Sequence, residues 1–190
     1  MQNDARRFGL QSRSALSVPE REIASEKIAE KVIHSPWFRK ARTIGCYLPT
    51  PAEVDTRLII ARAWRMKKRI FVPVLKKNQR MIFQEIGPET DLLLNRFGIY
   101  EPKNGDCIPA RDLDIVITPV VAFDDSNNRI GMGGGYYDRA FSFLQHRKFA
   151  FRPRLIGVAF ACQKVEQIAP NPWDIRLFAT FTEVATAERR

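Results

Sequence analysis

The feature that most constrains this chain is a glycine-rich stretch at residues 129–139, which reads Arg-Ile-Gly-Met-Gly-Gly-Gly-Tyr-Tyr-Asp-Arg. It follows an apolar run at residues 115–123 and a short polar turn at residues 124–128. After it, apolar side chains recur with a helical period at Tyr137, Ala140, Phe141 and Leu144. The pattern therefore predicts a strand, a turn, a glycine loop and a helix, in that order.

The composition of this loop indicates a phosphate site. Glycines adopt positive φ and admit a ligand close to the backbone, so that successive N–H groups can surround an anion. The helix that follows would add the positive end of its dipole. Arg129 and Arg139 flank the loop as cations, and Asp138 offers a carboxylate to phosphate-bound magnesium. The alternative is a glycine-rich turn that only introduces a core helix.

The charge of the chain favours an anionic partner. The 31 basic and 21 acidic residues give a net charge of +10, which suits a nucleic acid, a nucleotide or a polycarboxylate. The length of 190 residues fits one domain, which we expect to span residues 1–190. Cys46, Cys107 and Cys162 form no Cys-x-x-Cys pair, so we expect reduced, buried thiols. A polar N-terminus and short apolar runs predict a cytoplasmic protein.

Helical and extended patterns alternate along the chain. Residues 4–14 are weakly helical, and Ser-Val-Pro-Glu at residues 17–20 is a capping box that predicts a helix to about His34. Asp55 or Thr56 can cap another helix, which would end near residue 68. Extended segments are predicted at residues 43–48, 69–75, 81–85, 115–118, 155–160 and 180–186.

These elements predict an α/β fold. We expect a single domain with a mostly parallel, twisted sheet and helices on both faces, because strands alternate with helices. Residues 91–100 are expected to be mostly loop, since Gly98 lies within the segment and Pro102 follows it. Such sheets bind ligands beyond the carboxyl ends of their strands, so the loops after Leu48, Phe123 and Phe160 should share one edge.

Several motifs together resemble one enzyme family. Gly-Met-Gly-Gly-Gly-Tyr-Tyr-Asp-Arg, with Phe-Asp at residues 123–124 before it, is similar to the signature of the 5-formyltetrahydrofolate cyclo-ligases, or methenyltetrahydrofolate synthetases. Weaker motifs follow the family's order: Tyr-Leu at residues 47–48, Glu-Val-Asp-Thr at 53–56, Gly-Ile-Tyr-Glu-Pro at 98–102, Trp-Asp-Ile at 173–175 and the closing residues 180–183. Together they cover nearly the whole chain.

The resemblance implies an ATP- and Mg²⁺-dependent cyclisation of 5-formyltetrahydrofolate to 5,10-methenyltetrahydrofolate, with release of ADP and phosphate. Phosphorylation of the formyl oxygen would turn it into a leaving group for attack by N10. Such a site works mainly by positioning and by neutralising charge, and it requires no side-chain nucleophile.

The family's functional positions can be matched to this chain. The resemblance implies ATP contacts at Arg6, Arg129, Ile130, Gly131, Met132, Gly133, Gly134, Gly135, Tyr136 and Tyr137. It implies folate contacts at Leu48, Glu53, Phe97, Met132, Gly133, Gly134, Gly135 and Tyr136. It implies magnesium ligands at Asp138 and Asp174, and catalytic roles for Arg129, Asp138 and Arg139.

Some of these assignments have simpler alternatives. The Glu53 carboxylate could accept paired hydrogen bonds from the pterin's amino and ring N–H edge, or it could only complement a helix dipole. Asp174 could be an ordinary loop carboxylate. Relatives commonly carry further lysines or arginines before the position of Arg6, whereas residues 2–3 here are Gln-Asn, so Arg7 could replace Arg6 in the ATP contact.

Two other classes of function compete with the cyclo-ligase reading. A nucleic-acid-binding module would explain the charge, but not the glycine loop, and the chain has no recognised nucleic-acid motif. A binding-only relative would have lost turnover, which the presence of Glu53, Asp138 and Asp174 argues against. We therefore expect a monomeric enzyme with folate and ATP as small-molecule substrates and no nucleic-acid or membrane partner.

Overall fold

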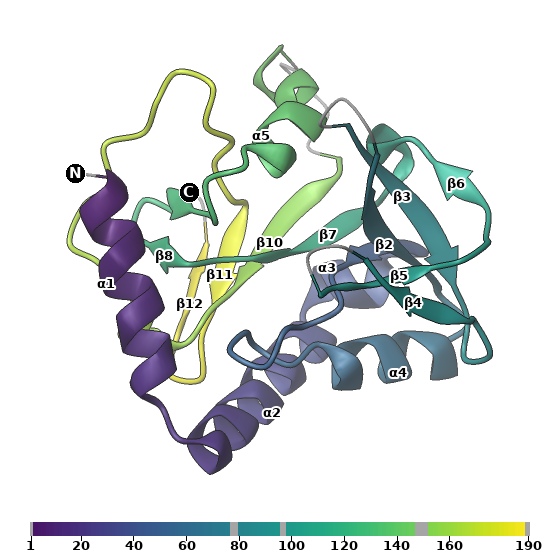
Figure 1. Cartoon of the computed structure of the whole chain (residues 1–190), viewed down its shortest axis with the longest axis horizontal. Coiled ribbons are helices and arrows are strands. Elements are labelled where there is room, and N and C mark those ends of the chain that lie inside the picture. Colours follow the sequence, from purple (N-terminus) through teal and green to yellow (C-terminus); the bar gives the residue numbers. More distant parts are fainter. Residues whose placement is uncertain (1, 77–79, 96–97, 147–151, 189–190) are drawn as a thin grey trace.

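A computed structural model describes residues 2–76, 80–95, 98–146 and 152–188 (Figure 1). The helices are α1 (Gln2–Ala15), α2 (Val18–His34), α3 (Pro36–Lys40), α4 (Arg57–Arg65) and α5 (Tyr136–Ala140), with 3₁₀ turns η2 (Ala110–Asp112), η3 (Ser142–His146) and η4 (Ala161–Gln163). The strands are β1 (Thr43–Cys46), β2 (Arg69–Leu75), β3 (Met81–Ile86), β4 (Leu92–Leu94), β5 (Tyr100–Pro102), β6 (Cys107–Ile108), β7 (Ile115–Pro119), β8 (Ala122–Phe123), β9 (Arg129–Ile130), β10 (Arg154–Val158), β11 (Ala179–Phe181) and β12 (Thr186–Glu188).

The described residues form one large sheet with the strand order β12-β11-β10-β7-β1-β2-β3-β6. Its central strands, from β11 to β2, run parallel, whereas β12, β3 and β6 pair antiparallel at the two edges. The predicted α/β fold with a mostly parallel sheet is therefore confirmed. The extended segments predicted at residues 69–75 and 81–85 are also confirmed, and they pair antiparallel as the β2–β3 ladder.

Alternate side chains of each strand point to opposite faces, and helices cover both faces unequally. On one face, Ile44 and Ile117 pack with Ile28 of α2 and Ile59 of α4. On the other face, residues such as Val116 and Leu155 pack against the region around α5 and η3. Figure 1 shows α2, α3 and α4 along one side of the sheet and α5 on the other. The prediction of helices on both faces is thus confirmed.

Helix α1 lies at one end of the sheet, beside the small antiparallel pair of β8 and β9 (Figure 1). Gly9 makes this close approach possible, because a Cβ at this position would lie 2.0 Å from the carbonyl oxygen of Val121. The helix backbone therefore packs directly on the segment that leads toward the glycine loop. This contact determines which face of α1 borders the site.

Both predicted helix starts are present. At the second one, Asp55 caps the helix and Thr56 bonds to another part of the chain. Ser17 and Glu20 form the reciprocal capping box expected for α2. At the start of α4, the Asp55 carboxylate accepts a hydrogen bond from the backbone N–H of Arg57 at 2.9 Å. Thr56 is the N-cap residue, but its hydroxyl donates to the carbonyl of Tyr47 at 2.7 Å. It therefore ties α4 to the end of β1.

The expectation of mostly loop at residues 91–100 did not include the hairpin of β4 and β5, which pair antiparallel and bring residues 92–94 and 100 into strands. The backbone N–H of Asn95 donates to the carbonyl of Ile99 at 2.9 Å, and Gly98 has a positive φ of 71°. The three leucines of β4 are exposed, so no alternation of apolar and polar residues marked this strand. Main-chain pairing across a glycine turn stabilises the hairpin instead.

The final extended segment at residues 180–186 is also different from the prediction. The structure has two strands there, β11 and β12, which pair antiparallel around a tight turn. Thr182 closes this turn, since its backbone N–H donates to the carbonyl of Ala185 at 2.9 Å and its hydroxyl accepts from the N–H of Ala185, also at 2.9 Å. A threonine hydroxyl that bonds the backbone three residues further on favours such a reversal over continued extension.

Two further expectations need correction. The α-helix after the glycine loop has only five residues and is followed by a 3₁₀ turn, and Phe141 between them is fully buried. The dipole of so short a helix adds less to anion binding than we expected. Among the cysteines, all of which are free, Cys46 is buried and Cys162 half-buried, but Cys107 is exposed in the short edge strand β6.

Candidate active site

A cavity of about 1120 Å³ lies beyond the carboxyl ends of the parallel strands. Leu48 and Glu53 line it from the segment after β1, and residues 129–139 line it from the glycine stretch. Asn171, Trp173 and Asp174 line it from the long connection after β10. The prediction that the loops after Leu48, Phe123 and Phe160 share one edge is therefore confirmed. Helix α1 forms a further wall.

A buried aspartate builds the turn between β8 and β9 that precedes the glycine loop. The Oδ1 atom of Asp124 accepts hydrogen bonds from the backbone N–H groups of Ser126, at 3.0 Å, and Asn128, at 2.9 Å. Its Oδ2 atom accepts from the Asn128 side chain at 2.8 Å and from the N–H of Ile168 at 2.9 Å. These four bonds hold the hairpin rigidly, so β9 delivers the loop to a defined place.

The glycine loop follows β9 directly and uses positive φ twice, at Gly133 (97°) and Gly135 (63°). Residues with side chains rarely adopt these angles, so the sequence requires glycine there. The guanidinium of Arg139 donates to the carbonyl of Gly134 at 2.7 Å and lies 5.1 Å from the centre of the Tyr136 ring. Arg139 and Tyr136, which both belong to the following helix α5, therefore hold the loop in place.

Helix α1 supplies a second arginine to the loop. The Nε atom of Arg6 donates to the carbonyl of Gly131 at 2.9 Å, and its Nη1 donates to Asn3 at 2.6 Å. Its guanidinium carbon lies 3.6 Å from where a Cβ on Gly133 would stand. Arg7, by contrast, is exposed and pairs with Asp4 at 3.3 Å. The structure thus brings Arg6 to the cavity, and Arg7 does not line it.

Arg129 and Asp138 form a nearly buried ion pair at 2.7 Å, with side chains that are 5% and 20% exposed. The same Asp138 oxygen also accepts a hydrogen bond from the backbone N–H of Ile175 at 3.1 Å. The guanidinium of Arg129 lies 5.5 Å from the centre of the Tyr137 ring, and its Nε has no hydrogen-bond acceptor among the described residues. The positive charge of Arg129 is therefore directed at Asp138, and Arg129 holds this carboxylate in position.

Glu53 lines the cavity from the segment that follows β1. Its Oε2 atom accepts hydrogen bonds from the backbone N–H and the hydroxyl of Thr50, both at 2.9 Å. Next to it, the Tyr47 hydroxyl donates to the carbonyl of Val54 at 2.8 Å. Burial, and then the negative charge of Glu53, raise the pKa of Tyr47, while burial also raises the pKa of Tyr137. Both phenols stay neutral at physiological pH and cannot serve as bases.

The two carboxylates predicted as metal ligands border the same cavity. Asp174 accepts hydrogen bonds at its Oδ2 from Gln2, at 2.9 Å, and from the backbone N–H of Asn171, at 2.7 Å. Within the described residues, Asp138 makes its hydrogen bonds through Oδ1 and Asp174 through Oδ2, and no cluster of three or more His, Cys, Asp or Glu residues occurs. Magnesium commonly takes one or two protein carboxylates together with substrate phosphates, so this donor set fits it.

Comparison with known proteins places the chain in a family. A model of the 5-formyltetrahydrofolate cyclo-ligase family matches residues 2–183. The chain belongs to this family. The 5-formyltetrahydrofolate cyclo-ligase of Escherichia coli K12 is 36% identical over 176 residues, which cover 90% of this chain and 94% of that protein. The cyclo-ligase of Haemophilus influenzae is 34% identical over 170 residues, or 87% and 89% of the two chains.

Solved structures agree with this membership of the cyclo-ligase family. The chain is similar to the NMR structure of Aquifex aeolicus 5,10-methenyltetrahydrofolate synthetase, with a TM-score of 0.84 and 29% identity. The match covers 100% of this chain and 93% of that one. A 5,10-methenyltetrahydrofolate synthetase from Mycoplasma pneumoniae has a TM-score of 0.74 and 25% identity, over 96% and 98% of the two chains.

The fold brings nearly all of the family's matched positions to one cavity. Among the predicted site residues, those that line it are Arg6, Leu48, Glu53, Arg129, Ile130, Gly131, Met132, Gly133, Gly134, Gly135, Tyr136, Tyr137, Asp138, Arg139 and Asp174. Phe97, the predicted aromatic contact of the pterin, lies outside the described residues. The sequence reading missed Gln2 and Arg13, which line the cavity from α1. Their spacing of four and seven residues from Arg6 could have predicted that all three lie on one face of α1.

Proposed function

We propose that this protein catalyses the ATP- and Mg²⁺-dependent cyclisation of 5-formyltetrahydrofolate to 5,10-methenyltetrahydrofolate, with release of ADP and phosphate. Membership of the cyclo-ligase family supports this reaction. The observation that carries the proposal is a single cavity lined by the glycine loop, by Glu53 and by the Asp138 and Asp174 carboxylates. At about 1120 Å³ the cavity exceeds the usual volume of a small-molecule pocket, about 300 to 1,000 Å³, as a site for two substrates requires.

The reaction explains why a phosphate loop and a folate site must adjoin. N10 of the folate attacks the carbon of the N5-formyl group, and the formyl oxygen has to leave. Transfer of the γ-phosphoryl group of ATP to this oxygen releases ADP and makes the oxygen part of a phosphate leaving group. The C–N bond then forms as the C–O bond breaks, and N10 loses its proton. Such chemistry depends on positioning and on neutralising phosphate charge.

The residues around the glycine loop would bind and orient the triphosphate. We infer that the backbone N–H groups of the loop meet its phosphate oxygens, with Arg6 and Arg139 as neighbouring cations. Both arginines hold loop carbonyls, at Gly131 and Gly134, so they fix the loop as well as add charge. Arg129 would act by holding Asp138 in place through their ion pair. A direct ATP contact of Arg129 stays a prediction.

Asp138 and Asp174 would hold the magnesium ion. When bound, magnesium neutralises charge on the phosphate oxygens. The hydrogen bonds of Asp138 to Arg129 and Ile175 restrict its carboxylate to one orientation, and those of Asp174 to Gln2 and Asn171 do the same. Preorganised carboxylates need no rearrangement when substrate arrives, which is the main source of electrostatic rate enhancement.

One assay tests the proposed function directly. The methenyl product absorbs in the near ultraviolet, so its formation can be followed as the purified protein is mixed with 5-formyltetrahydrofolate. We expect product only when ATP and magnesium are both present, with one ADP released for each product formed. Folate binding without product would favour a binding-only relative. Product formation that does not require ATP would contradict the proposed chemistry.

Replacing Glu53 with glutamine should weaken folate binding. We propose that its carboxylate accepts paired hydrogen bonds from the pterin, and the loss of a charged acceptor weakens binding by about 10- to 100-fold. We therefore expect a higher KM for 5-formyltetrahydrofolate at saturating ATP, with a smaller change in KM for ATP. Asp55→Asn is the matched control, because Asp55 lies on the same segment but pairs with Arg57 and does not line the cavity. A normal folate KM for Glu53→Gln would contradict the assignment.

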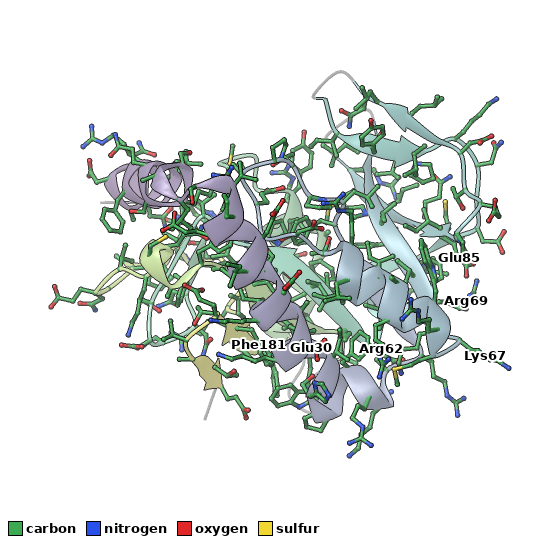
Figure 2. The ribbon with its side chains drawn as sticks, turned by 90° about the horizontal axis from the view of Figure 1, so that it is seen from below. Glu30, Arg62, Lys67, Arg69, Glu85 and Phe181 are labelled. Carbon is green, nitrogen blue, oxygen red and sulfur yellow. The ribbon has the colours of Figure 1, made fainter. Side chains whose placement is uncertain are left out.

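Much of the positive charge lies away from the cavity. Arg62, Arg65 and Lys67 are exposed at the end of α4, which leads into the amino end of β2, whereas Arg69 pairs with Glu85 (Figure 2). We expect this cluster to bind DNA only weakly, with affinity that falls steeply toward physiological salt, as counterion release without specific contacts requires. Fluorescence anisotropy with labelled duplex and single-stranded DNA measures this. Sequence-selective binding at physiological salt would overturn the expectation.

The remaining expectations about partners and location stay predictions. No helix within the described residues is long and apolar enough to cross a lipid bilayer. We propose action in the cytoplasm as a monomer on small-molecule substrates. Sedimentation of the purified protein at enzyme-assay concentrations would test the oligomeric state.

A further inference from the structure

One stripe of α1 borders the cavity along the length of the helix. Gln2, Arg6 and Arg13 line it, and their spacing of four and then seven residues keeps them on one helical face. Gln2 contacts Asp174, and Arg6 contacts the glycine loop. Arg13 stands two turns further on, about 10 Å along the axis from Arg6, given the rise of about 1.5 Å per residue. It therefore reaches a different part of the site.

Arg13 is a buried cation that has no partner in the part of the chain that the structure describes. The residue is only 6% exposed, and its Nε has no hydrogen-bond acceptor among the described residues. Among the described residues, it forms no ion pair and no side-chain hydrogen bond, whereas the similarly buried Arg129 is paired with Asp138. A guanidinium cannot lose its proton to escape the cost of burial. The folded chain thus keeps a permanent positive charge at the cavity wall, and burying an unpaired charge is unfavourable.

Arg13 lines the same cavity as Tyr47 and Glu53. Burial raises the pKa of Tyr47 most, the charge of Glu53 raises it further, and the charge of Arg13 lowers it, so both charges act on the same phenol. Glu53 does not neutralise Arg13, because its carboxylate bonds to Thr50 and forms no ion pair within the described residues. Because no described residue supplies an anion to Arg13, a bound substrate is the candidate for its partner.

We propose that Arg13 is an oxyanion-binding residue of the substrate site. Its planar fork of N–H donors matches two oxygens of a phosphoryl or carboxylate group. This inference rests on the proposed function, which supplies two sources of such a group. One is the phosphoryl group that moves from ATP to the formyl oxygen, and the other is the glutamate carboxylate of the folate.

The test compares Arg13→Met with Arg7→Met. Methionine keeps the apolar stem and removes the charge, and Arg7 is an exposed arginine of the same helix that pairs only with Asp4 among the described residues. We expect Arg13→Met to unfold at the same or a higher temperature than the wild type, because an unpaired buried charge is gone. We expect it to weaken binding of one substrate, or turnover, by about 10- to 100-fold. Arg7→Met should change neither.

Binding of each substrate alone distinguishes the two sources. Weaker binding of MgATP to Arg13→Met by calorimetry, or a loss confined to kcat at unchanged Tm, identifies the phosphoryl group as the partner of Arg13. Weaker binding of 5-formyltetrahydrofolate, measured by calorimetry with its mono- and polyglutamate forms, identifies the carboxylate as the partner of Arg13. Arg13→Lys should recover part of the loss, since it restores the charge without the fork.

The inference fails if Arg13→Met matches the wild type in both affinities and kcat. It also fails if Tm falls and activity only follows the folded fraction. Because wild-type turnover is measured alongside, a wild type that forms no product refutes the proposed function separately.

Discussion

Asp138→Asn should lower kcat by about two orders of magnitude or more, the loss expected when an electrostatic contact to the transition state disappears. The change keeps the shape of the side chain and removes the charge that would hold magnesium against the phosphates. Folate binding should change little, because Glu53 lies on a separate segment of the cavity wall. Steady-state kinetics over a range of magnesium concentrations measure the effect. If kcat recovers at high magnesium, the substitution has lowered the affinity for the metal. If kcat does not recover, the metal binds but is wrongly placed.

The ion pair with Arg129 adds a second consequence, which must be separated from the first. Asparagine would leave the nearly buried Arg129 without its counter-charge, so we also expect a lower Tm. Assays must therefore be run well below that Tm, with circular dichroism to confirm folding. Asp125→Asn serves as control, since Asp125 is an exposed partner of Lys164 outside the cavity lining. Normal turnover of Asp138→Asn, or a defect mainly in folate KM, would mean that Asp138 has a structural role only.

Gly134→Val should abolish turnover, and with it the thermal protection by ATP, while the protein still folds. A Cβ at this position would lie 2.7 and 2.8 Å from two ring carbons of Tyr136, so the ring or the loop must move. The same ring lies under Arg139, whose guanidinium holds the Gly134 carbonyl, so one substitution disturbs both supports of the loop. Differential scanning fluorimetry with and without MgATP and the absorbance assay give the two readouts.

The matched control for this variant is Gly87→Val. A Cβ on Gly87 would meet only the Thr90 hydroxyl, at 4.0 Å, and Gly87 lies outside the cavity lining. Its activity and its protection by MgATP should equal those of the wild type. If Gly134→Val retains activity near that of this control, the loop does not bind phosphate. Loss of the circular dichroism spectrum in Gly134→Val alone would make the less bulky Gly134→Ala the variant to measure.

The sequence by itself determined the features that depend on neighbours along the chain. The glycine loop was visible because positive φ and close approach require glycine at specific positions, as Gly133 and Gly135 confirm. The capping box at Ser17 and the strands β2 and β3 could also be predicted, since caps and strand periods involve residues a few positions apart. The order of strands and helices then sufficed to predict a mostly parallel sheet with its site at one edge.

Only the tertiary structure decided what each charged side chain meets, because those contacts join residues that are distant in sequence. Arg6 bonds to Gly131, 125 positions away, and Asp138 bonds to Ile175, 37 positions away. The burial of Arg13 follows from the docking of α1 through Gly9, and a pattern of local periods carries no information about that contact. Burial and pairing set the energy of a charge, so its role in the site emerges only when packing has fixed its surroundings.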